Sequence, residues 1–242
     1  ILKMKAFLYS FILQWKLDIR DKGVFITYYA IPLAFFLIMG NIFSSVLPNA
    51  KETLIPSMTI FGVTMGTIVG SPIMLVDVYG SEIKKSYQVG HIPLYNVIIV
   101  NFLSAFIHSF IFSLIVYIIG PMIFNVYRPD NVMIYFMQLT LYIISGLSIG
   151  GVLGVIVKKT SQLTMVGQIV FLPSIMLSGI MFPASMLPPF LQTVGKIFPA
   201  TWCYQMMSDG TISLEMLLPV VLICLVCLII CVIQLKRIQR PS

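Results

Sequence analysis

The sequence LEMLLPVVLICLVCLIICVIQL, residues 214–235, decides the fold class of this 242-residue chain. Glu215 is the one charged residue in the run, and it stands at the second position. A bilayer with a hydrocarbon core about 30 Å thick requires roughly 20 apolar residues in a helix that crosses it. The run therefore predicts a transmembrane helix.

Five earlier stretches are similarly long, apolar and poor in charge: 24–47, 56–78, 94–119, 132–157 and 163–182. The whole chain is 59% hydrophobic and 10% charged, with a mean hydropathy of +1.01. Soluble domains are typically about 25% charged. We therefore predict an all-α integral membrane protein with six transmembrane helices, in which residues 1–242 form a single domain.

The distribution of basic residues predicts how the helices are oriented. The net charge is +7, but the Lys and Arg residues stand at the ends of the spans and form no basic patch of the kind that binds nucleic acid. A cytoplasmic N-terminus places twelve of them inside and three outside, so the positive-inside rule predicts two cytoplasmic termini. The inner set is Lys3, Lys5, Lys16, Arg20, Lys22, Lys84, Lys85, Lys158, Lys159, Lys236, Arg237 and Arg240, and the outer set is Lys51, Arg128 and Lys196.

Residues 3–22 precede the first span and have helical periodicity. Their apolar residues recur at steps of three and four, as expected for one face of a helix; they are Met4, Phe7, Leu8, Phe11, Ile12, Trp15 and Ile19. With basic residues around this face, the segment predicts an amphipathic helix in the inner membrane interface. A helix packed against the spans is the alternative.

Two spans carry glycine at every fourth position. The second span contains Gly62, Gly66 and Gly70, and the fourth contains Gly146, Gly150 and Gly154. Small residues at this spacing allow helix backbones to approach closely within a bilayer. We interpret both runs as helix-packing faces.

The most polar internal stretch is 77–93, which the charge distribution places in the cytoplasm. It predicts a short helix that ends at Gly90 and Pro93. Such a helix could be a docking surface for a cytoplasmic partner or simply a solvated connection.

Residues 183–212, between the fifth and sixth predicted spans, are too interrupted to cross a membrane. Four prolines break any continuous helix: Pro183, Pro188, Pro189 and Pro199. A helical stripe of apolar residues lies among them: Phe190, Leu191, Val194, Ile197 and Phe198. We predict an outer re-entrant hairpin, whose irregular backbone requires protein or water around it.

The sequence contains no pattern that would make the chain an enzyme. It has no G-x-x-x-x-G-K-[ST] phosphate loop, and its spans contain no paired carboxylates or zinc-binding His-Glu-x-x-His, so we expect no catalytic residue and no metal site. His108 lies inside the third span, where we expect a neutral side chain bonded to a neighbouring helix. The four cysteines, Cys203, Cys224, Cys227 and Cys231, are interpreted as small packing residues.

Three short runs carry a resemblance to a known family: LSGIMFP at 177–183, LPPFL at 187–191 and IFPATW at 197–202. Together they resemble the signature of the ABC-2 type permease family. The order of elements is also similar, from an interfacial first helix through six spans to the outer hairpin. The resemblance thus extends over nearly the whole chain, although only the run 177–202 is specific.

The resemblance implies a permease subunit of an ATP-binding-cassette exporter in a bacterial plasma membrane. In this family the loop after the second span docks on the ATPase subunit, which would assign coupling to Glu82, Lys84, Lys85 and Tyr87. It further implies a dimer of permease subunits with two partner ATPases, which bind ATP and magnesium in place of any cofactor in this chain. A non-transporting membrane protein, such as an immunity protein or a lipid-modifying enzyme, is the alternative.

Overall fold

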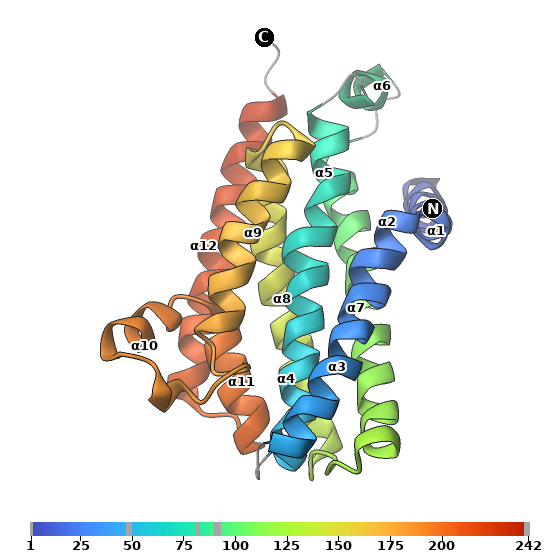
Figure 1. The fold of residues 1–242 in the computed structure, drawn as a ribbon. Coiled ribbons are helices and arrows are strands. Elements are labelled where there is room, and N and C mark those ends of the chain that lie inside the picture. The colour runs from blue at the N-terminus through green and yellow to red at the C-terminus, as the bar shows by residue number, and fades with distance from the viewer. Residues whose placement is uncertain (1, 47–49, 81–82, 90–92, 240–242) are drawn as a thin grey trace.

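The computed structural model describes residues 2–46, 50–80, 83–89 and 93–239, and every regular element in these ranges is a helix (Figure 1). The first half comprises α1 (Leu2–Arg20), α2 (Lys22–Phe25), η1 (Ile26–Ala30), α3 (Ile31–Val46), α4 (Ala50–Thr64), η2 (Met65–Gly70), α5 (Ser71–Tyr79), α6 (Ile83–Val89) and α7 (Tyr95–Phe124). The second half comprises α8 (Val132–Ile156), α9 (Thr160–Met176), η3 (Ala184–Met186), α10 (Pro189–Gly195), α11 (Pro199–Asp209) and α12 (Leu214–Gln239). Two of these elements, η1 and η2, are π-helical turns, and η3 is a 3₁₀ turn.

Within the described residues, five helical stretches are long and apolar enough to cross a membrane: Lys22–Phe43, Lys51–Tyr79, Tyr95–Phe124, Val132–Ile156 and Leu214–Ile238. They correspond to five of the six predicted spans. The remaining one, 163–182, corresponds to α9, which has 17 residues and ends at Met176. Beyond it the chain turns, with Gly179 at a φ of 91°, so the sixth crossing stays a prediction.

The long stretch formed by α4, η2 and α5 is the centre of the bundle. It packs against α3, α7, α8, α9 and α11, and all its residues from Leu54 to Ile68 are buried. Two hydrogen bonds tie it to α8: Thr59 Oγ1 lies 2.8 Å from the Tyr135 hydroxyl, and Thr64 bonds to Tyr142. These four buried hydroxyls therefore satisfy one another across the helix interface.

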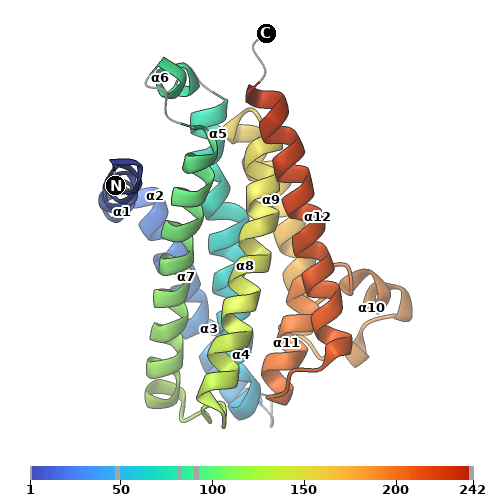
Figure 2. The ribbon, with the colours of Figure 1, turned by 180° about the vertical axis from the view of Figure 1, so that it is seen from behind.

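The two ends of the bundle differ in the elements they carry. α6, α1 and the C-terminal end of α12 gather at one end, whereas the α7–α8 connection lies at the other (Figures 1 and 2). The α8–α9 connection joins the first group, because Thr160 Oγ1 donates to Asp77 Oδ1 at the end of α5 over 3.1 Å. The segments carrying most of the basic residues therefore share one end, which we call the basic end; that this end is cytoplasmic stays a prediction.

The first helix lies across the bundle. α1 is seen nearly end-on where the spans run vertically (Figures 1 and 2), and it packs against α7. It corresponds to the predicted helix over 3–22, and it touches the spans as the alternative interpretation required. Its location in a membrane interface stays a prediction.

Candidate functional site

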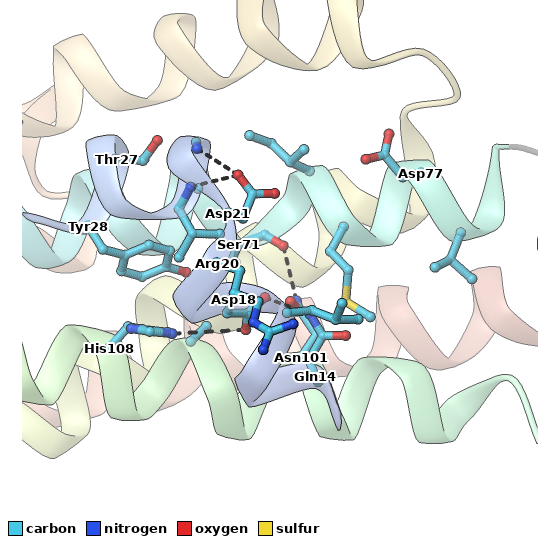
Figure 3. A pocket seen from close by; sticks show the side chains of 18 of the residues that line it. Gln14, Asp18, Arg20, Asp21, Thr27, Tyr28, Ser71, Asp77, Asn101 and His108 are labelled. Atoms are coloured by element: carbon cyan, nitrogen blue, oxygen red, sulfur yellow. Dashed lines mark hydrogen bonds and ion pairs between the residues drawn. The ribbon is translucent and has the colours of Figure 1, made fainter. Parts of the chain in front are cut away.

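A cavity of about 590 Å³ lies at the basic end, between α1, α2, η1, α5, α6 and α7 (Figure 3). Its charged and polar lining includes Gln14, Asp18, Arg20, Asp21, Asn101 and His108. Apolar side chains form much of the remaining wall, among them Leu17, Val24, Ile73, Met74, Val78 and Ile83. The volume is within the range of small-molecule sites, about 300–1,000 Å³.

Asp18 connects α1 to α7 at the edge of this cavity. Its carboxylate accepts hydrogen bonds from Ser104 Oγ of α7 and, over 2.7 Å, from Gln14 Nε2 of its own helix. Burial raises the pKa of Asp18 above its ordinary range; the two hydrogen bonds oppose this shift, and the charge of Asp21 adds to it. No Lys or Arg of the described chain forms an ion pair with Asp18, so its charge is compensated only by neutral donors.

His108 of α7 lies beside Asp18 and is almost fully buried, with 3% of its surface exposed. Its Nδ1 is 2.7 Å from the Tyr29 hydroxyl of η1, and its ring stacks on Trp15 of α1 with centroids 4.5 Å apart. Its Nε2 has no hydrogen-bond partner within the described chain and is 4.0 Å from Asp18 Oδ2. The contact with Tyr29 is the bond to a neighbouring helix that the sequence led us to expect.

Asp18 and Asn101 were not among the sequence-predicted site residues. Asn101 Nδ2 donates to the Ser71 carbonyl of α5 over 3.0 Å, and Ser104 and His108 follow it along α7. The steps of three and four between these polar residues place them on one face of an apolar span. That spacing was a readable signal, but the residue that completes the cluster, Asp18, is 86 residues from Ser104 in sequence.

The predicted coupling residues are distributed differently. Glu82 lies outside the described residues, and Lys84, Lys85 and Tyr87 lie on α6. Tyr87 is half-buried: it packs against the small cluster of Leu75, Val78 and Val97, and it lines the cavity. Tyr87 thus contacts the bundle and is no freely projecting side chain.

The two glycine runs lie at close helix contacts. A Cβ on Gly62 would be 2.0 Å from the Phe112 ring of α7, and Gly66 and Gly70 lie against the ring of Tyr28 in η1. In the second run, Gly146 and Gly150 approach Thr67 of η2, and Gly154 approaches Leu75 of α5. The second and fourth spans therefore contact each other at Gly146, Gly150 and Gly154. The glycines of the second span, Gly62, Gly66 and Gly70, instead contact aromatic rings of other helices.

Residues 183–212 leave the bundle sideways and return. α10 stands off from the other helices, and α11 lies beside α12 (Figures 1 and 2). The predicted apolar stripe is divided, because Val194 is half-buried while Phe190 is 74% exposed. Pro183, Pro188 and Pro189 are exposed in the outgoing half, and Pro199 is buried where α11 begins.

The return helix α11 is fixed to α8. Gln138 Nε2 donates to the carbonyls of Met206 and Thr211, over 2.8 and 2.9 Å. Since Gln138 belongs to the first half of α8, the C-terminal end of α11 lies toward the end of the bundle opposite the basic end. The depth of this hairpin in a membrane stays a prediction.

Comparison with known families identifies this architecture. A family model described as ABC-2 type transporter matches residues 5–212. The chain belongs to the ABC-2 type transporter family. The match extends from α1 to the loop before α12, so it includes the cavity, the glycine runs and the α10–α11 segment. A search among curated proteins found no match.

Membership of the ABC-2 family makes the chain a multi-pass membrane component of a transporter. The resemblance drawn from residues 177–202 is thereby confirmed. Among the described residues, no group of three His, Cys, Asp or Glu side chains is placed to hold a metal ion. The functional question is therefore what the polar cavity and the basic end contact.

Proposed function

We propose that this chain is the permease subunit of an ATP-driven exporter, with six spans that include α9, and that it works as a dimer with separate ATPase subunits. The family match over residues 5–212 carries the proposal. In this view ATP and magnesium bind in the partner ATPases. The membrane is the plasma membrane of a bacterium, with both termini in the cytoplasm.

The basic end offers a surface on which an ATPase could dock. α6 projects beyond the spans (Figure 1), and it packs on α5. The α8–α9 connection supports the same region, because a Cβ on Gly80 would be only 2.5 Å from the Lys158 carbonyl. A push on α6 would therefore reach α5 directly, and through α5 it would reach the α8–α9 connection and α9.

The outward faces of the bundle agree with a lipid environment and a second subunit. Much of α12 is exposed although it is apolar, including Leu222, Val226 and Ile229. An apolar surface of this length is stable in a bilayer or against another membrane helix, and would be costly in water.

The experiment that tests the proposal is co-purification with an ABC ATPase, sought first among the reading frames that neighbour this one. Reversing two charges of the coupling loop, Glu82→Lys with Lys84→Glu, should weaken association, because buried or partly buried charge pairs at an interface are sensitive to sign. Arg128→Glu, at the opposite end, is the matched control and should associate normally. If the double variant retains both association and stimulated ATP turnover, the loop does not couple the subunits.

The alternative of a non-transporting protein makes a different forecast. An immunity protein would protect cells without a Walker-containing partner, so deleting the ATPase that co-purifies with the chain would leave protection intact. Loss of the phenotype on deletion would favour the exporter.

A further inference from the structure

The cavity at the basic end combines a largely buried carboxylate with a histidine nitrogen that has no partner within the described chain. The Asp18 side chain is 14% exposed, and no Lys or Arg of the described chain pairs with it. Buried charges in proteins are normally paired, because an uncompensated charge is costly in a medium of low dielectric constant. A cationic group would supply the charge partner that Asp18 lacks within the described chain.

Asp18 Oδ2, which already accepts a hydrogen bond from Ser104, and the unpartnered His108 Nε2 can reach the same group. Asp18 Oδ2 and His108 Nε2 are 4.0 Å apart, so one nitrogen can lie within hydrogen-bonding distance, about 2.9 Å, of both. The Tyr29 hydroxyl can accept a hydrogen bond from Nδ1–H of His108, and in that tautomer Nε2 is an acceptor. Two acceptors facing one point fit a group with several N–H donors.

The rest of the lining favours a positive charge joined to an apolar chain. Asp21 and Asp77 add carboxylates to the wall, and Arg20 is the one Lys or Arg among the described residues that line it. Leu17, Ile73 and other apolar side chains continue the wall beyond the carboxylates. Because α1 lies across the basic end of the bundle (Figures 1 and 2), the cavity lies beside a helix suited to the membrane interface, where amphiphiles concentrate.

We propose that this cavity binds the ammonium group of an amphiphile, with Asp18 Oδ2 and His108 Nε2 accepting its N–H groups and Leu17 and Ile73 contacting its first methylenes. The proposal goes beyond the exporter function and does not require an ATPase, since binding concerns this chain alone. The ammonium group can come from a lipid headgroup or from a soluble amphiphile.

Trp15 reports on the site because its ring stacks on His108. The chain has two tryptophans, so Trp202→Phe leaves Trp15 as the sole indole fluorophore. The full chain is placed in nanodiscs of phosphatidylglycerol, which has no ammonium group, and titrated with dodecylammonium. Dodecanol and ammonium chloride are titrated in parallel as probes that lack the charge or the chain.

We expect a saturable change in Trp15 emission with dodecylammonium, none with dodecanol, and at least about a tenfold weaker response with ammonium chloride. Asp18→Asn keeps the side-chain size but removes the charge, and should weaken dodecylammonium binding by about tenfold or more. Asp130→Asn, on an exposed loop at the other end, should bind as the parent does.

Equal binding by Asp18→Asn and the parent, or equal responses to dodecanol and dodecylammonium, would show partition into lipid and overturn the proposal. Equal potency of ammonium chloride would show a small-cation site and also overturn it. If Asp18→Asn does not fold, Ile73→Phe decides instead: it narrows the cavity from its edge, and undiminished dodecylammonium binding would overturn the proposal.

Phosphatidylethanolamine distinguishes the two sources of the ammonium group, a lipid headgroup and a soluble amphiphile. If adding it to the nanodiscs raises the apparent dissociation constant for dodecylammonium, the site accepts a lipid headgroup, and Arg20→Gln should reduce that competition because the guanidinium can pair with the lipid phosphate. If the constant does not change, the ammonium comes from a soluble amphiphile. Both results support the ammonium site. Neither depends on an ATPase partner, so a failed co-purification would not contradict them.

Discussion

Replacing Gly150 with Ala should separate α8 from the central stretch. The added Cβ would lie 2.1 Å from the Thr67 carbonyl oxygen, and ordinary contact begins at 3.4 Å, so the two backbones must part by about 1.3 Å. The obstacle is backbone and cannot rotate away. Gly151→Ala is the matched control, because its Cβ would meet only Cys231 Sγ at 3.5 Å.

The expected cost follows from two opposing effects. Overpacking a close contact costs about 1–3 kcal/mol, while alanine recovers up to about 1 kcal/mol of helix propensity over glycine. Gly151→Ala makes the same propensity gain without the clash, so Gly150→Ala should be less stable than this control by about 1–3 kcal/mol, which corresponds to an apparent Tm lower by about 2–12 °C for a chain of this size. Heating in one detergent followed by size-exclusion chromatography measures this change for both variants. If Gly150→Ala melts at or above Gly151→Ala, the proposed helix-packing role of this glycine is wrong.

Three further outcomes are expected. A double-mutant cycle of Thr59→Val and Tyr135→Phe should give a coupling free energy of about 0.6 kcal/mol, typical of interhelical hydrogen bonds in membranes, and zero coupling would mean that the 2.8 Å bond contributes nothing. In a cysteine-free background, an impermeant thiol reagent on intact cells should label Thr193→Cys and should label Lys159→Cys only after permeabilisation; the reverse pattern would invert the orientation. Burial raises the folded-state pKa of Asp18, so the stability that its protonated carboxyl contributes is present at acidic pH and lost as pH rises through that pKa. Asp18→Asn should lack this decrease when the free energy of unfolding is measured against pH. Identical pH dependence in the variant and the parent would contradict this expectation.

The spans were predictable because hydropathy and length record the demands of the bilayer directly. The end of the fifth span could not be predicted, because Leu177, Ile180, Met181 and Phe182 are apolar although the helix has already ended at Met176. Gly179 takes a φ of 91° there, a backbone conformation that side chains disfavour and that hydropathy does not encode. An apolar residue in a turn and one in a span look alike in sequence.

The candidate site was only half visible in the sequence. The polar face of α7 could be recognised from its spacing, since its residues belong to one helix. The position of Asp18 beside Ser104 depends on how α1 lies across the bundle, and helix periodicity carries no information about a contact between separate helices. The sequence therefore predicted α1 as an amphipathic helix and not as the source of a carboxylate for the cavity.

The two π-helical turns near His108 have the same position relative to a proline. η1 ends at Ala30, two residues before Pro32, and η2 ends at Gly70, two residues before Pro72. A proline within a helix lacks an N–H, and its ring crowds the carbonyl four residues earlier. A wider preceding turn relieves that clash without breaking the helix.

Each π turn also changes which face of its span points inward. A turn with i→i+5 bonding contains an extra residue, so the side chains that follow it are rotated by about 100° relative to an uninterrupted helix of 3.6 residues per turn. η1 and η2 contact each other, and there the Tyr28 ring fits against Gly66 and Gly70, while Tyr29, next in η1, reaches His108 Nδ1. Both tyrosines of η1 therefore reach His108 in different ways: the Tyr28 ring lies against the glycine run with its centroid 5.3 Å from that of His108, and the Tyr29 hydroxyl bonds to Nδ1.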